Sequence, residues 1–141
     1  MMSGTTFDVD VIASSGSRSV GFADGAVIHR RGDPGDEAYI VRNGRVEIRQ
    51  KGRAVETIGP GEVFGEAGLL DGSRRLTTAV AVGAVDLIPL DRRMFDVLVR
   101  DDEEFAMTIM RLLARRLRAT TEMFERCVDD QPSRDRATAA G

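Results

Sequence analysis

The chain has 141 residues, enough for one ordinary domain with a single hydrophobic core. Its hydrophobic and charged fractions, 42% and 30%, are those of a globular protein, and its net charge of −3 argues against direct DNA binding by this chain. No apolar run reaches the roughly 18 residues of a membrane span, and no signal peptide is evident, so we expect a cytoplasmic protein. A single histidine, His29, and a single cysteine, Cys127, exclude an internal disulfide and a metal site built from several such ligands.

The two ends of the chain differ in composition from its middle. Residues 1–20 are rich in serine, glycine and threonine, and residues 129–141 lack any apolar period. We therefore expect a flexible N-terminal arm and a flexible tail. The remaining residues, 21–128, are expected to form one domain, which changes character at Arg92. Glycine is frequent before Arg92 and is absent after it until the last residue.

Residues 22–90 predict an antiparallel sandwich or barrel, because short apolar alternations are separated by glycine-containing turns. Three such stretches are 38–41, 45–49 and 54–58. The dipeptide Asn43-Gly44 predicts a hairpin turn between the first two, and Lys51-Gly52 separates the second from the third. Many short strands with this punctuation indicate an antiparallel sandwich or barrel of about eight strands.

Residues 92–128 predict two helices, so the fold class is mainly β with α. Phe95 and Leu98 give the first, short helix an apolar face. The acidic run 101–104 then suits the start of a second helix, because carboxylates stabilise a helix N-terminus. This long C-terminal helix is expected to continue to about Val128.

The long helix carries two apolar faces. One, which we call the seam, has the heptad spacing typical of paired helices and consists of Met110, Leu113, Leu117, Thr120, Phe124 and Cys127. The other is expected to pack on the barrel and consists of Phe105, Ile109 and Leu112. We predict a homodimer through helix 101–128, and the alternative is one broad face buried within the monomer.

Two further expectations concern polar residues of this helix. A solvated face is expected to carry Arg111, Arg115, Arg116 and Arg118. Cys127 lies on the seam, where a disulfide across a dimer is geometrically possible, but a reduced thiol is expected in the cytoplasm.

Residues 64–78 carry the chemistry, because a helix-like turn between glycines interrupts the strands there. The first residues of such a turn present free backbone N–H groups to an anion. Arg75, or alternatively Arg74, can add a bidentate contact to a phosphate. Glu66 would repel phosphate but can accept a hydrogen bond from a sugar hydroxyl. This combination indicates a nucleotide, whereas Glu66 alone would indicate only an exposed carboxylate at a helix start.

The segment Phe64-Gly65-Glu66-Ala67-Gly68-Leu69 followed by Arg74-Arg75-Leu76-Thr77-Thr78 resembles the phosphate-binding cassette of the cyclic nucleotide-binding domain family. That pattern reads F-G-E-[LIM]-[AG]-L and then P-R-x-A-[TS]. Residues 32–46 resemble the family's G-D-x-G-D hairpin, and residues 90–95 resemble its exit from the barrel into a short helix. The resemblance covers about residues 21–127. It implies a jelly-roll barrel, or double-stranded β-helix, of about eight strands, followed by a short helix and a long C-terminal helix. Within the family, the chain is similar to the regulatory domain of catabolite activator proteins without their helix-turn-helix.

The resemblance implies roles for individual residues. The phosphate and ribose of the ligand would be bound by Gly65, Glu66, Ala67, Gly68, Arg75 and Leu76. Thr120 and Thr121 match two hydroxyl residues that contact the base, one of them from the partner subunit; the alternative is that they are merely solvated. Arg74 replaces the family proline and is the alternative phosphate contact. Leu76 stands where a hydroxyl residue favours cGMP in some relatives, which favours cAMP here, and Thr77 replaces the usual alanine.

These features predict a regulatory domain that binds a cyclic nucleotide, cAMP in preference to cGMP. Ligand binding is expected to change the position of its C-terminal helix, and no catalysis is expected. The ligand is its only expected small molecule, with no cofactor and no metal, and its downstream protein partner is unknown. Two alternatives stay open, namely an interaction module of this fold without such a ligand and a regulatory fragment of a longer transcription factor. A cupin-type enzyme is excluded, because its metal requires a histidine cluster. His29 is expected on the barrel surface without a role.

Overall fold

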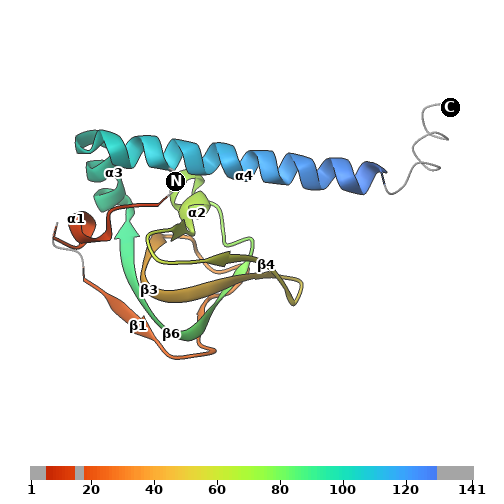
Figure 1. Ribbon diagram of the computed structural model, residues 1–141, viewed down its shortest axis with the longest axis horizontal. Coiled ribbons are helices and arrows are strands. Elements are labelled where there is room, and N and C mark those ends of the chain that lie inside the picture. The colour runs from red at the N-terminus through yellow and green to blue at the C-terminus, as the bar shows by residue number, and fades with distance from the viewer. Residues whose placement is uncertain (1–5, 15–17, 130–141) are drawn as a thin grey trace.

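The structure is a computed structural model that describes residues 6–14 and 18–129. A curved antiparallel sheet of six described strands forms a roll, and helices cover one side of it (Figure 1). In chain order the described elements are α1 (Val9–Ser14), β1 (Val20–Phe22), β2 (Val27–His29), β3 (Glu37–Gln50), β4 (Arg53–Ile58), β5 (Val63–Phe64), α2 (Glu66–Asp71), β6 (Thr78–Asp91), α3 (Arg92–Asp101) and α4 (Glu103–Asp129). This architecture confirms the predicted fold class.

Two long strands, β3 and β6, form the centre of the roll. They pair antiparallel from Glu37 opposite Asp91 to Arg49 opposite Thr78. β1 and β2 pair with β6, while β4 and β5 pair with β3. Each long strand has 14 residues, and β3 takes the place of the two strands expected at 38–41 and 45–49.

The predicted hairpin turn at Asn43-Gly44 is wrong, because β3 runs straight through it. The pairing with β6 shifts register on both sides of Asn43, so the dipeptide forms an irregularity within the strand. Gly44 has a φ of 90°, and a Cβ there would collide with the carbonyl oxygen of Ala84. Gly44 therefore allows β3 and β6 to approach each other closely at this point, and the chain does not reverse direction there.

The turn between β3 and β4 is confirmed at Lys51-Gly52. Both residues have positive φ, 52° and 76°, as a tight hairpin with right-handed strand twist requires. The strands pair from Val46 opposite Ile58 to Gln50 opposite Arg53.

Buried apolar side chains form two clusters. One fills the interior of the roll and includes Val46, Phe64 and Leu87. The other lies between the strands and the helices and includes Ile40, Leu90, Phe95, Phe105, Ile109 and Leu112, so the predicted barrel-facing side of the long helix is confirmed. Phe7 and Ile12, from the expected N-terminal arm, are buried in this second cluster, where Phe7 lies 4.9 Å from Phe105 between ring centroids. The domain boundaries at 21 and 128 stay predictions.

Both C-terminal helices begin at acidic caps. Asp91 accepts a 2.8 Å hydrogen bond from the backbone N–H of Met94, and Asp102 accepts one of 3.1 Å from Phe105. Figure 1 shows α4 lying along one side of the roll above α2, with its C-terminal part extending past the strands. Within residues 6–14 and 18–129, no helix combines the length and apolar character that crossing a membrane would need.

The seam on α4 is exposed. Leu117 is 69% exposed and Phe124 is 67% exposed, and Met110 and Leu113 are exposed as well. The alternative of one broad face buried within the monomer is therefore wrong. Cys127 is exposed too and carries a free thiol.

Candidate functional site

The cassette predicted from the sequence is a short helix held between two left-handed glycines. Gly65 precedes α2 with a φ of 79°, and Gly72 follows it with a φ of 73°. Gly68 packs directly on Gly35 of the β2–β3 loop, and a Cβ on Gly68 would lie 2.9 Å from the Cα of Gly35. Gly68 is thus needed for a close approach between two backbones, which fixes α2 on the roll.

Arg75 is buried behind this helix and is only 7% exposed. Its guanidinium donates to the backbone carbonyl oxygens of Gly65, at 2.9 Å, and of Glu37. It also lies 6.0 Å from the centre of the Tyr39 ring. Burial lowers the pKa of Arg75, but an arginine starts so far above neutrality that it stays charged. The cassette therefore has a fixed positive charge on its inner side.

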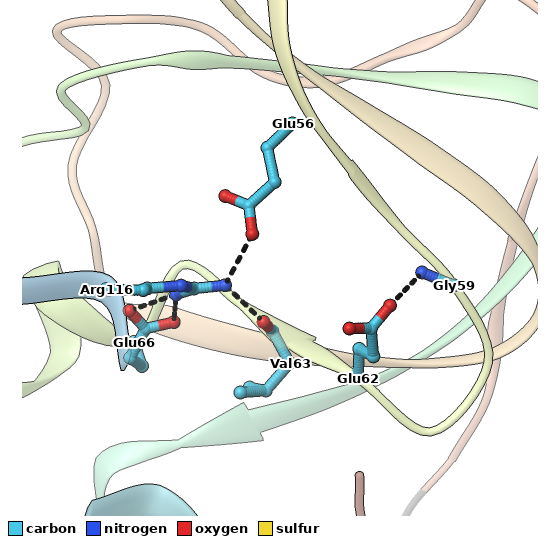
Figure 2. Close-up of polar contacts among 6 residues, drawn as sticks. All are labelled: Glu56, Gly59, Glu62, Val63, Glu66 and Arg116. Carbon is cyan, nitrogen blue, oxygen red and sulfur yellow. Dashed lines mark hydrogen bonds and ion pairs between the residues drawn. The ribbon is translucent and has the colours of Figure 1, made fainter. Parts of the chain in front are cut away.

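Glu66, the first residue of α2, is 4% exposed and forms an ion pair with Arg116 of α4 (Figure 2). Arg116 donates to both carboxylate oxygens of Glu66 and, at 2.9 Å, to the backbone carbonyl of Val63. A second acidic side chain, Glu56 of β4, lies 3.8 Å from Arg116. The expectation of a solvated Arg116 is wrong, because its guanidinium pairs with the buried carboxylate of Glu66 on α2.

A cavity of about 460 Å³ lies between the cassette and α4. Of the predicted site residues it is lined by Gly65, Glu66, Ala67, Gly68, Arg74, Arg75, Leu76 and Thr120. The lining also has apolar surface, which comes from Ile48, Val55, Leu113 and Leu117. The lining thus combines arginine and carboxylate side chains with apolar surface and threonine hydroxyls, which suits a nucleotide.

Three predicted residues occupy peripheral positions. Arg74 is exposed and donates to the backbone carbonyl of Gly32 at 2.9 Å, so Arg75 is the better enclosed of the two arginines. Leu76 is 70% exposed at the cavity edge. The hydroxyl of Thr121 is exposed and donates back to the carbonyl of Leu117 at 2.9 Å, and the described cavity lining includes Thr120 but not Thr121.

His29 also lines the cavity, which corrects its expected place on the barrel surface. It is 7% exposed, at the end of β2, and its ring centre lies 6.0 Å from that of Phe64. Burial, followed by the charge of Arg75, lowers its pKa to about 4. The imidazole is therefore neutral at pH 7.

The family model described as "Cyclic nucleotide-binding domain" matches residues 19–102, which include the cassette. The chain belongs to the cyclic nucleotide-binding domain family. This membership confirms the resemblance drawn from the cassette and the barrel.

Curated relatives come from bacteria and eukaryotes. A "CRP-like cAMP-activated global transcriptional regulator" of Mycobacterium tuberculosis is 33% identical over 106 residues, which are 72% of this chain and 47% of the relative. The "Cyclic AMP receptor protein" of Thermus thermophilus is 36% identical over 116 residues, 79% of this chain and 53% of the relative. A cAMP-dependent protein kinase regulatory subunit of Dictyostelium discoideum is 37% identical over 56% of this chain and 27% of the relative. The chain thus spans about half the length of the two bacterial relatives.

Solved structures give the same result. The catabolite activator protein of Thermus thermophilus superposes with a TM-score of 0.73 at 34% identity, covering 83% of this chain and 57% of that chain. A protein described with a cyclic-GMP-dependent signalling pathway of bacterial phytopathogenesis superposes with a TM-score of 0.71 at 27% identity, covering 81% and 97%.

Proposed function

We propose that this domain is a sensor that binds a cyclic nucleotide, cAMP in preference to cGMP, without catalysing a reaction on it. The single observation that carries the proposal is one cavity that brings together buried Glu66, buried Arg75 and the apolar side of α4. Arg75 would pair with the cyclic phosphate, and Glu66 would accept the ribose 2′-hydroxyl. The relatives described as cAMP-activated and as a cyclic AMP receptor support this ligand class.

The contact between Glu66 and Arg116 supports a means of transmission. Arg116 is carried by α4, whereas Glu66 belongs to the cassette, so this ion pair joins the ligand site to the long helix. A ribose hydroxyl bound at Glu66 shares the carboxylate with Arg116 or displaces it. Either outcome changes the free energy of the contact that holds α4, and binding would therefore shift the population of helix positions.

Isothermal titration of the purified chain with cAMP and with cGMP tests the proposal. We expect binding of both, tighter for cAMP. No heat and no shift in thermal unfolding temperature at millimolar ligand would leave the second candidate, an interaction module of this fold. One observation favours that candidate, because Arg75 and Glu66 already have internal hydrogen-bond partners in the structure without ligand.

Base recognition is expected to depend on Thr120 more than on Thr121. Thr120 lines the cavity, whereas the hydroxyl of Thr121 donates to Leu117 on the helix itself. Thr120→Ala should therefore change the ratio of the cAMP and cGMP dissociation constants by several fold, the scale of one lost neutral hydrogen bond of about 1 kcal/mol. Thr121→Ala is the matched control. It should leave the ratio of the two dissociation constants unchanged, because Thr121 does not line the described cavity of its own chain. An effect of Thr121→Ala alone would assign the base contact to the partner chain of a dimer.

We also propose a homodimer through the exposed seam of α4. Sedimentation velocity of the intact chain should show a dimer that Phe124→Asp disrupts, because a charge at a paired apolar position leaves a desolvated carboxylate. Met123→Asp is the control, since Met123 is exposed on the same helix but lies off the heptad positions. Equal loss in both variants, or a monomeric parent chain, would contradict pairing through the seam.

The downstream partner is proposed to be a protein or a further domain that responds to α4. Because the chain spans about half of its bacterial relatives, a place within a longer transcription factor is an alternative to a free-standing sensor. Binding of this chain to its ligand is expected in both cases.

A further inference from the structure

His29 and Arg75 stand together in the wall between two cavities. The first is the 460 Å³ cavity of the proposed ligand site, and the second, of about 290 Å³, lies on the side of Asp33, Glu37 and Tyr39. Of the described residues, these two are the ones that line both cavities. A group that approaches Arg75 from the ligand side therefore approaches His29 as well.

The ring nitrogens of His29 lack a hydrogen-bond partner among the described residues. The side chain is more than nine-tenths buried, and neither Nδ1 nor Nε2 forms a hydrogen bond of good geometry within residues 6–14 and 18–129. The backbone of Thr77 approaches the ring without closing such a bond. Buried polar side chains in native proteins are almost always satisfied, so two open nitrogens on a cavity wall indicate a group that binds from inside the cavity.

The charge state of the ring fits an anionic ligand. A neutral imidazole has one N–H donor and one acceptor, so it can donate to an oxygen without adding a second positive charge beside Arg75. The Nε atom of Arg75 also lacks a hydrogen-bond partner in the described part of the chain. Two adjacent side chains, one charged and one neutral, thus have unused donors at the same place.

We propose that His29 is a phosphate-binding residue of this site, which donates a hydrogen bond from its ring to the same phosphate group that Arg75 pairs with. The proposal rests on the proposed function, since it adds a contact to that ligand. It assigns His29 to the phosphate shared by cAMP and cGMP and not to the base that distinguishes them.

The only histidine of the chain gives a direct measurement. In spectra of the intact protein labelled with 15N-histidine, the ring signals belong to His29 alone. Without ligand, we expect titration near the low pKa of about 4. With saturating cAMP, the phosphate charge should raise that pKa by at least a unit and fix one ring tautomer. The pH dependence of affinity is a poorer readout, because the carboxylates of Asp33, Asp36 and Glu37 also line the second cavity beside the ring.

Binding of variants provides the second measurement. His29→Phe keeps a ring but removes both nitrogens, and it should weaken cAMP and cGMP by the same factor, about tenfold, the loss of one hydrogen bond to a charged group. Ile28→Leu is the control, because Ile28 precedes His29 on β2 and lines only the second cavity. Thermal unfolding of each variant checks that it folds, and the wild-type spectra decide the matter if His29→Phe does not fold.

The outcomes separate the two proposals. Equal weakening of both nucleotides together with a raised ring pKa supports the phosphate contact. A changed cAMP to cGMP ratio would move His29 to the base and overturn the assignment, as would unchanged ring signals in the complex or unchanged affinity of His29→Phe. A wild-type chain that binds neither nucleotide would overturn the proposed function, and the contact with it.

Discussion

Arg75→Ala is expected to weaken cAMP binding by about 1.5–3 kcal/mol, roughly tenfold to more than a hundredfold. The side chain is the charged group enclosed at the inner side of the cassette, and its removal leaves the phosphate without its charged partner. Isothermal titration at constant salt measures the loss. Because Arg75 also holds the carbonyl oxygens of Gly65 and Glu37, unfolding of the variant should be recorded beside it.

Arg74→Ala is the matched control for this prediction. Arg74 is adjacent and of the same type, but it is exposed and binds only the backbone of Gly32 among the contacts described. Its removal should change affinity by less than about threefold, as for an exposed charge in a screened environment. A larger loss for Arg74→Ala than for Arg75→Ala would reverse the assignment of the phosphate contact.

Arg116→Ala is expected to lower the free energy of unfolding by about 1.5–3 kcal/mol. The variant leaves the buried carboxylate of Glu66 without its ion-pair partner and the carbonyl of Val63 without its donor. The effect lies below that of a fully buried pair, since the side chain of Arg116 is 27% exposed. Urea unfolding of the chain without ligand gives the value.

Arg118→Ala serves as the control, since Arg118 is exposed on the same helix two residues away. Its effect should stay within about 0.5 kcal/mol. A double-mutant cycle with Glu66→Gln then isolates the pair, and the two changes should be non-additive. Additive effects of Arg116→Ala and Glu66→Gln would show that the pair does not join α4 to the cassette.

The elements with strong periodicity were predictable from the sequence. The helix boundary near 92 follows from the loss of glycine and the boundary near 103 from the acidic run, and the burial of Phe105, Ile109 and Leu112 follows from helical spacing. The cassette was predictable because its glycines, carboxylate and arginine lie close together along the chain. These features depend on local sequence, which is why sequence alone is informative about them.

Features that depend on distant partners were not predictable in this way. Asn43-Gly44 is a strong turn signal, but pairing of β3 with β6 along its whole length overrides the local preference. Arg116 lies among arginines whose pattern is that of a solvated face, and only the buried Glu66 fifty positions away changes its role. His29 ends a strand of three residues, too short for alternation to indicate which side faces inward.

Three residues of α4 belong to the exposed seam and also line the cavity, namely Leu113, Leu117 and Thr120. One strip of α4 is therefore available both to a ligand and to a second chain. If two chains pair there, self-association and ligand affinity become linked quantities, and each must change the other by the same factor. The apparent dissociation constant for the nucleotide would then vary with the concentration of the protein itself, so that abundance as well as ligand level would set the occupancy of the site.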